Sequence, residues 1–550
     1  MAVIAPAMAT VLIAAPACAA RPSAANSALT YVEARAAAMR GEHRRSAQLL
    51  AELAETNTTD ATIGRRALAE ALGAGNTELA LRLARRLPAA ELTVDARLLL
   101  VADELKHGRS DRALQFLASK NEDASLAFFE PLLTAWNAAE RKDLAGALAV
   151  LNKIPNSALL GPFRDENVAF ILLKFRRSQE AEPFARRAIG TAGGREDRLR
   201  LALADGFLAA GDRSRALAMI EGMGTDAGPA KQRVEAGRRT GLAIDQPTKA
   251  YAELLLGLAV DLNRLNNRAL PISMVQVARF ADPRNSAGAV LLALLLDSQD
   301  RSTEALAILS SVPASDPLAG QARDTAARIL VDEKKFDEAL ALAQSSTSAR
   351  DAGVSDFARL GDVLQGSKRY HEAADAYGRA LGLAKAQGLQ SELWPLYLLR
   401  ATAFESADRW PEARQSLQAA LALAPEQPLI LNFLGYAKLE RGEDLDSAEA
   451  MIRKASALAP DDASITDSLG WALYKRGRFA DAIDTLQRAA AKDPQQPEIH
   501  EHLGDALYAS GRRYEARFAW NAALISAEDD IAARIRLKLS AGLTPATAAP

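Results

Sequence analysis

The sequence is poor in several residue types that mark particular protein classes. Its 550 residues include one cysteine and five histidines, and aromatic side chains make up only 5%. A single cysteine excludes an internal disulfide framework. The low aromatic content beside 49% hydrophobic residues favours a stack of Ala- and Leu-rich helices over a sheet protein.

The chain also has no excess of charge of either sign. Its 67 basic and 69 acidic residues leave a formal net charge of -2. This balance provides no general attraction to nucleic acid or to anionic lipid, so we expect neither as a partner. No Pro- or Ser-rich linker divides the chain, although 550 residues exceed what one hydrophobic core usually serves. A repeat array resolves this conflict, because each unit packs only on its neighbours.

The histidines and glycines do not form a known catalytic or metal-binding motif. His500 and His502 are two positions apart and point to different sides of a helix, whereas histidines four apart can share a metal. His371 begins a metalloprotease-like HExxH that lacks its second histidine. Residues 222–228 miss the dinucleotide-binding spacing by one residue, and Lys231 is misplaced for a phosphate loop. We therefore predict no enzyme activity, no cofactor and no metal site.

The N-terminus resembles a targeting signal. Residues 2–20 read AVIAPAMATVLIAAPACAA, an apolar run followed by small residues, with residues 17–19 as an A-x-A cleavage site. The usual positive charge before such a run is missing. Cys18 is the candidate lipidated residue of a lipoprotein signal, although residues 15–17 depart from the usual Leu-led motif. A membrane anchor is the third alternative, and Pro6 and Pro16 make the run only marginally apolar for a span.

Residues 463–528 contain two copies of one pattern laid end to end. The residues that recur 34 positions apart are Leu469 and Leu503, Gly470 and Gly504, Gly477 and Gly511, and Ala482 and Ala516. Small residues allow two helices to cross closely, a turn glycine ends the first helix, and Pro494 stops the second. This period with these residues is the signature of tetratricopeptide (TPR) repeats, in which each unit is a pair of antiparallel helices.

The small residue early in each second helix can be followed along the whole chain. It falls at Ser46, Ala80, Ala113, Ala147, Ala181, Ala216, Pro271, Ala305, Ala339, Ala373, Ala413, Ala448, Ala482 and Ala516. The steps are 33 to 35 residues, except for 55 before Pro271 and 40 before Ala413. The Leu-Gly pair and the closing proline are mostly absent in the N-terminal half. We predict an all-α TPR superhelical solenoid of antiparallel helix pairs, with about fourteen repeats, many of them degenerate in the N-terminal half.

The same pattern divides the chain into segments. The predicted segments are a signal peptide or lipoprotein signal (1–20), degenerate TPR-like repeats (27–230), a basic insert (231–251), central repeats (252–393), well-formed repeats (394–530), a capping helix (531–540) and a disordered tail (541–550). The insert is either a docking site for an acidic partner or, as the simpler interpretation, an extra helix or a solvated loop.

One stretch of the chain resembles a known family. The run LNFLGYAKLERGEDLDSAEAMIRKASALAPDDASITDSLGWALYKRGRFADAIDTLQRA, followed by IHEHLGDALYASGRRYEARFAWNAAL, is similar to large bacterial, mainly proteobacterial, TPR proteins. Many of these are exported and some are outer-membrane lipoproteins. The resemblance is close over residues 252–539 and generic before them. The best understood members resemble adaptors that hold a carboxy-terminal processing protease and deliver cell-wall hydrolases to it. The resemblance implies an envelope scaffold with protein partners, including such a protease and its substrates, and membrane contact only through a lipid anchor.

We predict the binding surface on the first helix of each unit, which lines the concave groove of a TPR array. The residues placed there by register are Asn432, Tyr436, Asp467, Trp471, Tyr474, Glu501, Asp505 and Tyr508. Aromatic faces beside carboxylates suit an extended peptide or a partner helix, and the acids select lysine or arginine. In the alternative interpretation, Trp471 and Tyr474 only fill the seam between repeats. Asp467 and Glu501 stand where eukaryotic chaperone-binding TPR domains carry lysine, so that use is disfavoured.

The main hypothesis is an exported, non-catalytic adaptor that lies in the periplasm or is attached to the outer membrane. Two alternatives remain open at this point. One is a cytoplasmic scaffold for complex assembly, if the N-terminal run is not cleaved. The other is the substrate-selecting part of a transferase or hydrolase, which requires a domain outside the repeats.

Overall fold

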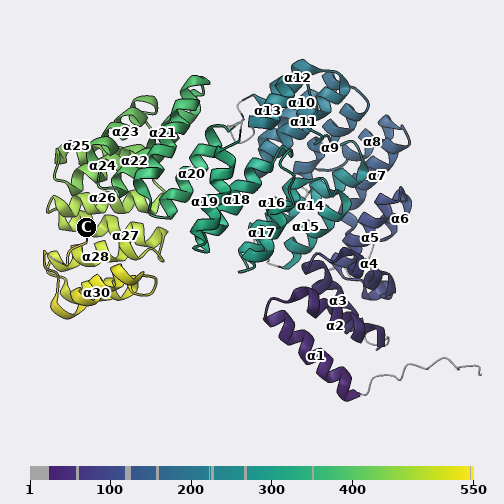
Figure 1. The fold of residues 1–550 in the computed structure, drawn as a ribbon, viewed down its shortest axis with the longest axis horizontal. Coiled ribbons are helices and arrows are strands. Elements are labelled where there is room, and N and C mark those ends of the chain that lie inside the picture. The colour runs from purple at the N-terminus through teal and green to yellow at the C-terminus, as the bar shows by residue number, and fades with distance from the viewer. Residues whose placement is uncertain are drawn as a thin grey trace, which may run out of the picture. The chain divides into compact units, whose positions relative to one another are not determined.

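The computed structural model describes residues 24–56, 61–117, 126–155, 160–221, 223, 228–264, 269–349, 352–545 and 547–549. Within these ranges all regular elements are helices and there are no strands (Figure 1). This confirms the predicted all-α class. The predicted signal at residues 1–20, with Cys18, lies outside the described residues.

The chain divides into two compact units, Met1–Ile329 and Leu330–Pro550, and the division falls within helix α18 (Ala319–Asp332). The α-helices of the first unit before α18 are α1 (Ala24–Met39), α2 (His43–Thr56), α3 (Ala61–Gly73), α4 (Thr77–Arg86), α5 (Val94–Lys106), α6 (Ser110–Gln115), α7 (Glu130–Glu140), α8 (Leu144–Leu151), α9 (Gly161–Lys174), α10 (Ser178–Thr191), α11 (Glu196–Ala210), α12 (Arg213–Ile220), α13 (Gly228–Glu235), α14 (Pro247–Arg264), α15 (Ala269–Ala281), α16 (Ser286–Asp297) and α17 (Ser302–Ser310). Short 3-10 helices lie at Ala89–Glu91, Ala127–Phe129 and Gly193–Arg195.

The second unit continues the same alternation of helices. After α18 it contains α19 (Phe336–Thr347), α20 (Val354–Gly366), α21 (Tyr370–Ala386), α22 (Gln390–Ser406), α23 (Trp410–Leu423), α24 (Pro428–Glu440), α25 (Leu445–Leu458), α26 (Ala463–Lys475), α27 (Phe479–Lys492), α28 (Pro497–Ala509), α29 (Arg513–Ala523) and α30 (Asp529–Ala541). Consecutive helices pack as hairpins, for example α24 on α25, α26 on α27 and α28 on α29.

The small residues that mark the repeat lie where the helices of a pair meet. All fourteen positions fall in the second helix of a hairpin, namely α2, α4, α6, α8, α10, α12, α15, α17, α19, α21, α23, α25, α27 and α29. Each of these residues is buried, and Ser46, Ala305 and Ala482 are among those with no exposed surface. The placement confirms the predicted solenoid of about fourteen helix pairs.

The turn inside a hairpin uses left-handed backbone, with or without glycine. Gly477 has φ 74° and Gly511 has φ 88°, as the pattern predicts. Lys334 (φ 59°) and Lys368 (φ 60°) adopt the same conformation at equivalent turns of earlier repeats. A side chain makes this conformation costlier by about 1 kcal/mol, which the packing of the hairpin tolerates. The same turn conformation therefore occurs in repeats that have no glycine at the turn.

Gly470 lies where α26 crosses α27, and we expect Gly470→Ala to destabilise this hairpin. A Cβ there stands 2.6 Å from Leu486 Cγ, which is closer than packed side chains allow. Overpacking of this kind costs about 1–3 kcal/mol, more than the helix gains from replacing glycine. Gly378 in α21 is the matched control, because a Cβ there meets no atom within 4 Å. We expect Gly378→Ala to stabilise the chain by up to about 1 kcal/mol in denaturant unfolding. Equal effects of the two substitutions would contradict the close crossing.

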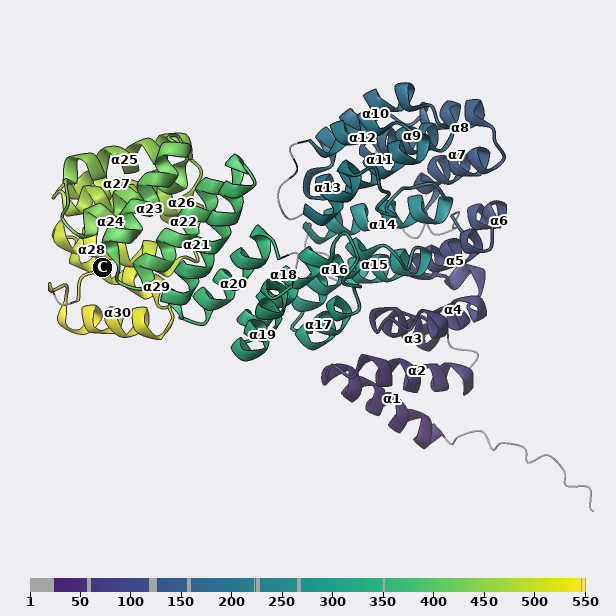
Figure 2. The same cartoon turned by 45° about the horizontal axis from the view of Figure 1, so that its top comes forward.

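In the first unit, helices α14 and α15 pack back onto much earlier repeats. Helix α14 contacts α5 and α7, and α15 contacts α3 and α5 (Figure 2). The hydroxyl of Tyr251, a fully buried residue of α14, donates to the carbonyl of Leu98 at 3.2 Å. Lys106 Nζ donates to the carbonyl of Phe280 at 2.8 Å. These contacts join segments about 150 residues or more apart, which a simple nearest-neighbour array does not do.

The basic insert consists of α13 and a connection that runs to α14. Asp205 of α11 has no exposed surface and holds this connection in place. Its carboxylate accepts backbone N–H groups from Thr240 at 2.6 Å, Gly241 at 3.1 Å and Ala243 at 3.0 Å. A buried carboxylate with three such donors is well satisfied, so the connection is fixed to α11.

Helix α30 covers the last hairpin through the fully buried Ile535, as an exposed solenoid end requires. A residue of the tail predicted to be disordered contacts this end of the array. The N–H of Ala549, a buried residue, donates to Asp505 Oδ2 at 2.9 Å. This backbone donor helps to satisfy the buried carboxylate of Asp505.

Candidate functional site

The eight predicted binding residues lie on α24, α26 and α28, the first helices of three consecutive hairpins. Helix α26 packs between the other two. Asn432 and Tyr436 are four residues apart, as are Asp467 and Trp471, and Glu501 and Asp505, so each pair lies on one face of its helix. The predicted strip is therefore continuous across three repeats.

Trp471 lies in the seam between α26 and its neighbours, with no exposed surface. Its indole N–H donates to Glu440 at 2.8 Å. Its ring stacks on Tyr474 at a centroid distance of 4.5 Å and on His502 at 4.2 Å. His502 Nδ1 lies 2.9 Å from Asp467 Oδ2. These side chains join α26 to α24 and α28.

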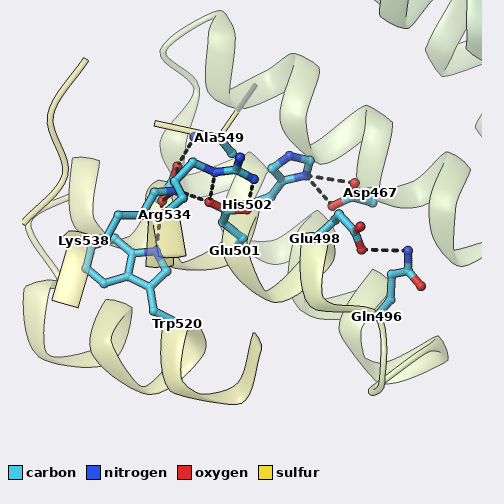
Figure 3. A network of polar contacts seen from close by, with 10 residues as sticks. Asp467, Gln496, Glu498, Glu501, His502, Trp520, Arg534, Lys538 and Ala549 are labelled. Carbon is cyan, nitrogen blue, oxygen red and sulfur yellow. Dashed lines mark hydrogen bonds and ion pairs between the residues drawn. The ribbon is translucent and has the colours of Figure 1, made fainter. Parts of the chain in front are cut away.

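Glu501 and Asp505 of α28 form ion pairs with cationic side chains of α30. Glu501 receives the guanidinium of Arg534 through two hydrogen bonds of 2.7 Å, and Lys538 Nζ lies 2.6 Å from Glu501 (Figure 3). Lys538 also donates to both oxygens of Asp505 at 2.8 Å. The indole of Trp520 adds a hydrogen bond to Asp505 at 2.9 Å. Lys538, Glu501 and Asp505 are all at most 1% exposed.

The predicted presentation of all eight residues to a partner is therefore corrected in part. Asp467, Trp471, Glu501 and Asp505 are buried, while the others, Asn432, Tyr436, Tyr474 and Tyr508, are half-buried. Glu501 and Asp505 are covered because α30 lies against α28 as the first helix of a further repeat would. Asp467 and Trp471 are covered where α26 meets its neighbours. Glu501 and Asp505, expected to select a basic partner, bind Arg534 and Lys538 of the same chain. Asp467 contacts His502.

The environment shifts the pKa values of these carboxyl groups in opposite directions. Burial raises the pKa of Glu501, but the hydrogen bonds and charges of Arg534 and Lys538 outweigh it and hold that pKa below its usual value. Burial dominates at Asp505, so the pKa of Asp505 is raised even beside Lys538. The network depends on its cations to keep the buried acids ionised.

We expect the contribution of His502 to stability to fall as pH rises. Burial lowers the pKa of His502, but the charge and hydrogen bond of Asp467, with Asp505 and Glu501 nearby, raise it above its usual value. A raised folded-state pKa stabilises the fold below the unfolded value, near 6.5, and this contribution is lost as pH rises through the folded value. The melting temperature of the protein should therefore exceed that of His502→Gln by more at about pH 6 than at about pH 8.5. A difference that stays constant with pH would argue against a charged His502.

A pocket of about 350 Å³ remains open between the three first helices. Four of the predicted residues line it, namely Asn432, Tyr436, Asp467 and Glu501. Ser464, Ser468 and Glu498 add polar groups, and Phe433 adds an apolar wall. The side-chain oxygen of Asn432 is buried without a hydrogen-bond partner. Trp471, Tyr474, Asp505 and Tyr508 do not reach the pocket.

Sequence reasoning did not assign Arg534, Lys538 and His502 to the site. A signal was present, since Arg534 and Lys538 are four residues apart, as are Glu501 and Asp505. Two complementary pairs with this spacing face each other when their helices pack side by side. Only the packing of α30 on α28 shows that they do.

Two further findings concern metals and membranes. In the described ranges, no group of three or more His, Cys, Asp or Glu side chains is placed to hold a metal ion. His500 and His502 face apart, because His500 Nε2 contacts the carbonyl of Pro494 whereas His502 contacts Asp467. None of the described helices combines the length and apolar character needed to cross a membrane.

Comparison with protein families identifies the class of repeat. A tetratricopeptide repeat family matches residues 398–463, and a second TPR repeat family matches residues 470–511. The first segment includes α24 with its pocket residues and the second includes α28, whereas Ser464, Asp467 and Ser468 of α26 fall between the two segments. Residues 398–511 thus contain TPR repeats, a class that serves as a scaffold for protein–protein interactions. A comparison with curated proteins found no match.

Several solved structures are similar to this chain. The crystal structure of the APC/C hetero-tetramer Cut9-Hcn1 has 14% identity and a TM-score of 0.40, with 95% of this chain and 97% of that chain covered. Yeast Tom70 has 13% identity and a TM-score of 0.33, with 94% and 96% covered. YrrB, a TPR protein with an unusual peptide-binding site, has 15% identity and a TM-score of 0.27, with 35% of this chain and 97% of that chain covered. Likeness at this level says nothing about the partners of this chain.

Proposed function

We propose that the protein is a non-catalytic scaffold that binds an extended segment of a partner protein in the pocket between α24, α26 and α28. The observation that carries this proposal is the convergence of Asn432, Tyr436, Asp467 and Glu501 on one open pocket. The Asn432 oxygen accepts a hydrogen bond from a bound backbone N–H, which replaces the partner that it lacks. Phe433 and Tyr436 provide apolar contact for a side chain of the ligand.

The proposal includes a place in the bacterial envelope and a role in presenting substrates to a carboxy-terminal processing protease. The sequence resemblance over residues 252–539 supports these two points, and the N-terminal apolar run supports export. An alkaline-phosphatase fusion after residue 30 tests the location. An active fusion is the expected result, and an inactive one would favour the cytoplasmic alternative.

Filling the pocket tests the binding site. Ser464 is exposed at the pocket, so Ser464→Trp blocks it without disturbing the core. Gln487→Trp on the exposed face of α27 is the matched control. Crosslinking in the native envelope followed by mass spectrometry measures the partners recovered. We expect Ser464→Trp to lose partners that the wild type and Gln487→Trp retain. Recovery of the same partners by all three proteins would exclude this pocket as the site.

A further inference from the structure

A second and larger cavity lies in the first unit and has the opposite charge character. Its volume is about 1220 Å³, and it is lined by the turn between α5 and α6, the end of α7, the turn between α9 and α10, the connection before α14, and the turn between α15 and α16. Nine basic side chains and four carboxylates line it. The whole chain has a net charge of -2, so this concentration of positive charge is local.

The cavity exists because distant repeats are held together around it. Helices α14 and α15 pack on α5, and Asp205 holds the connection before α14. Lys106 and Lys174 reinforce this arrangement, since Lys106 donates to the carbonyl of Phe280 and Lys174 to that of Asp245, both at 2.8 Å. The cavity is thus a built feature of the unit, and the basic insert forms one of its walls.

Several arginines at the cavity are not used by the fold. The side chains of Arg112, Arg176 and Arg284 are exposed and form no hydrogen bond or ion pair within the described structure. Arg239, from the insert, approaches only Asp205 at 3.9 Å. Arg301, by contrast, pairs with Glu304 at 2.7 Å. Guanidinium groups left unpaired around one cavity are available for an anionic ligand.

The chemistry of the cavity indicates the class of ligand. A guanidinium binds a carboxylate through two parallel hydrogen bonds, so several arginines favour a ligand with several carboxylates. The volume exceeds the range of about 300–1,000 Å³ that holds a drug-sized molecule, which favours a polypeptide segment. Single-stranded nucleic acid is disfavoured because the lining contains no aromatic side chain on which bases stack.

We propose that this cavity binds an acidic segment of a partner protein, rich in aspartate and glutamate. The inference shares with the proposed function the premise of a protein partner, but it uses a separate site. The connection that includes Arg239 and Asp245, together with Lys249 in the first turn of α14, is part of the recognition surface as well as of the fold.

Charge reversal in the full-length protein tests this site. The probe is a short fluorescein-labelled polyglutamate peptide, and the measurement is fluorescence anisotropy. The triple variant R112E/R176E/R284E should raise the Kd for polyglutamate by about tenfold or more, because three attractive charges become repulsive. The matched control is R35E/R44E/R82E, which reverses three exposed arginines of the same unit outside the cavity. Binding to the wild type should also weaken as salt increases.

The outcomes separate the alternatives. The proposal is supported if the control variant binds as the wild type does while the cavity variant, with an unchanged circular dichroism spectrum, does not. It is overturned if both triple variants weaken binding equally, if the wild type does not bind polyglutamate, or if a single-stranded oligonucleotide of equal charge binds more tightly. Ser464→Trp should leave polyglutamate binding unchanged, so a failure of the pocket in the second unit is distinguishable from a failure here.

Discussion

Replacing Lys538 by methionine should destabilise the C-terminal hairpins by about 3–5 kcal/mol. The methionine fills similar space but removes a buried charge that contacts both Glu501 and Asp505. Glu501 keeps Arg534, whereas Asp505 loses its buried cation and keeps only the donors Trp520 and Ala549. An uncompensated buried carboxylate is one of the costliest defects that a single substitution creates.

Hydrogen exchange of the full-length chain, read over α28 and α30, measures this effect locally. It suits the protein because an array of repeats does not unfold in one step. Arg536→Met is the matched control, since Arg536 is exposed on the same helix, and its effect should stay within about 0.5 kcal/mol. The loss of stability in Lys538→Met should be smaller at low pH, because Asp505 then takes up a proton. For the same reason, adding Asp505→Asn to Lys538→Met should restore part of the lost stability. Equal exchange in Lys538→Met and Arg536→Met would show that the network does not support the fold.

Replacing Trp471 by alanine should cost about 3–5 kcal/mol, as for other fully buried large aromatics. The substitution removes the stacking on Tyr474 and His502 and leaves Glu440 without its indole donor. Because these contacts join three helices, the loss should open the seams on both sides of α26. The exposed aromatic Phe518, with 62% of its surface accessible, is the matched control, and Phe518→Ala should have a small effect.

Denaturant unfolding and local hydrogen exchange distinguish these two variants. If Trp471→Ala destabilised the protein as little as Phe518→Ala does, the Trp471 side chain would not support the fold. It would then be free to contact a partner, as the prediction of eight binding residues implies. The expected destabilisation makes Trp471→Ala unsuitable for testing binding, because loss of a partner would then result from unfolding of the hairpins. Ser464→Trp avoids this confusion, since Ser464 is exposed at the pocket.

The helix pairs were predictable because their signal is local. A small residue such as Ala482 must recur where the second helix of each pair meets the first, so the period survives even in degenerate repeats. The residues of the site were predictable only as positions on a helix. The register placed Glu501 and Asp505 on the inner face of α28, but which groups cover that face depends on a helix about thirty residues further on.

The amino-acid sequence by itself determined the all-helical repeat, its period and the positions of its turns, since each depends on contacts within one hairpin or between neighbours. The tertiary structure alone decided that α14 and α15 close onto α3 and α5, that the insert forms a wall of a basic cavity, and that α30 neutralises the acids of α28. These features arise from packing between segments distant along the chain. A periodic pattern carries no information about such contacts, because the same repeat is compatible with many relative placements of distant helices.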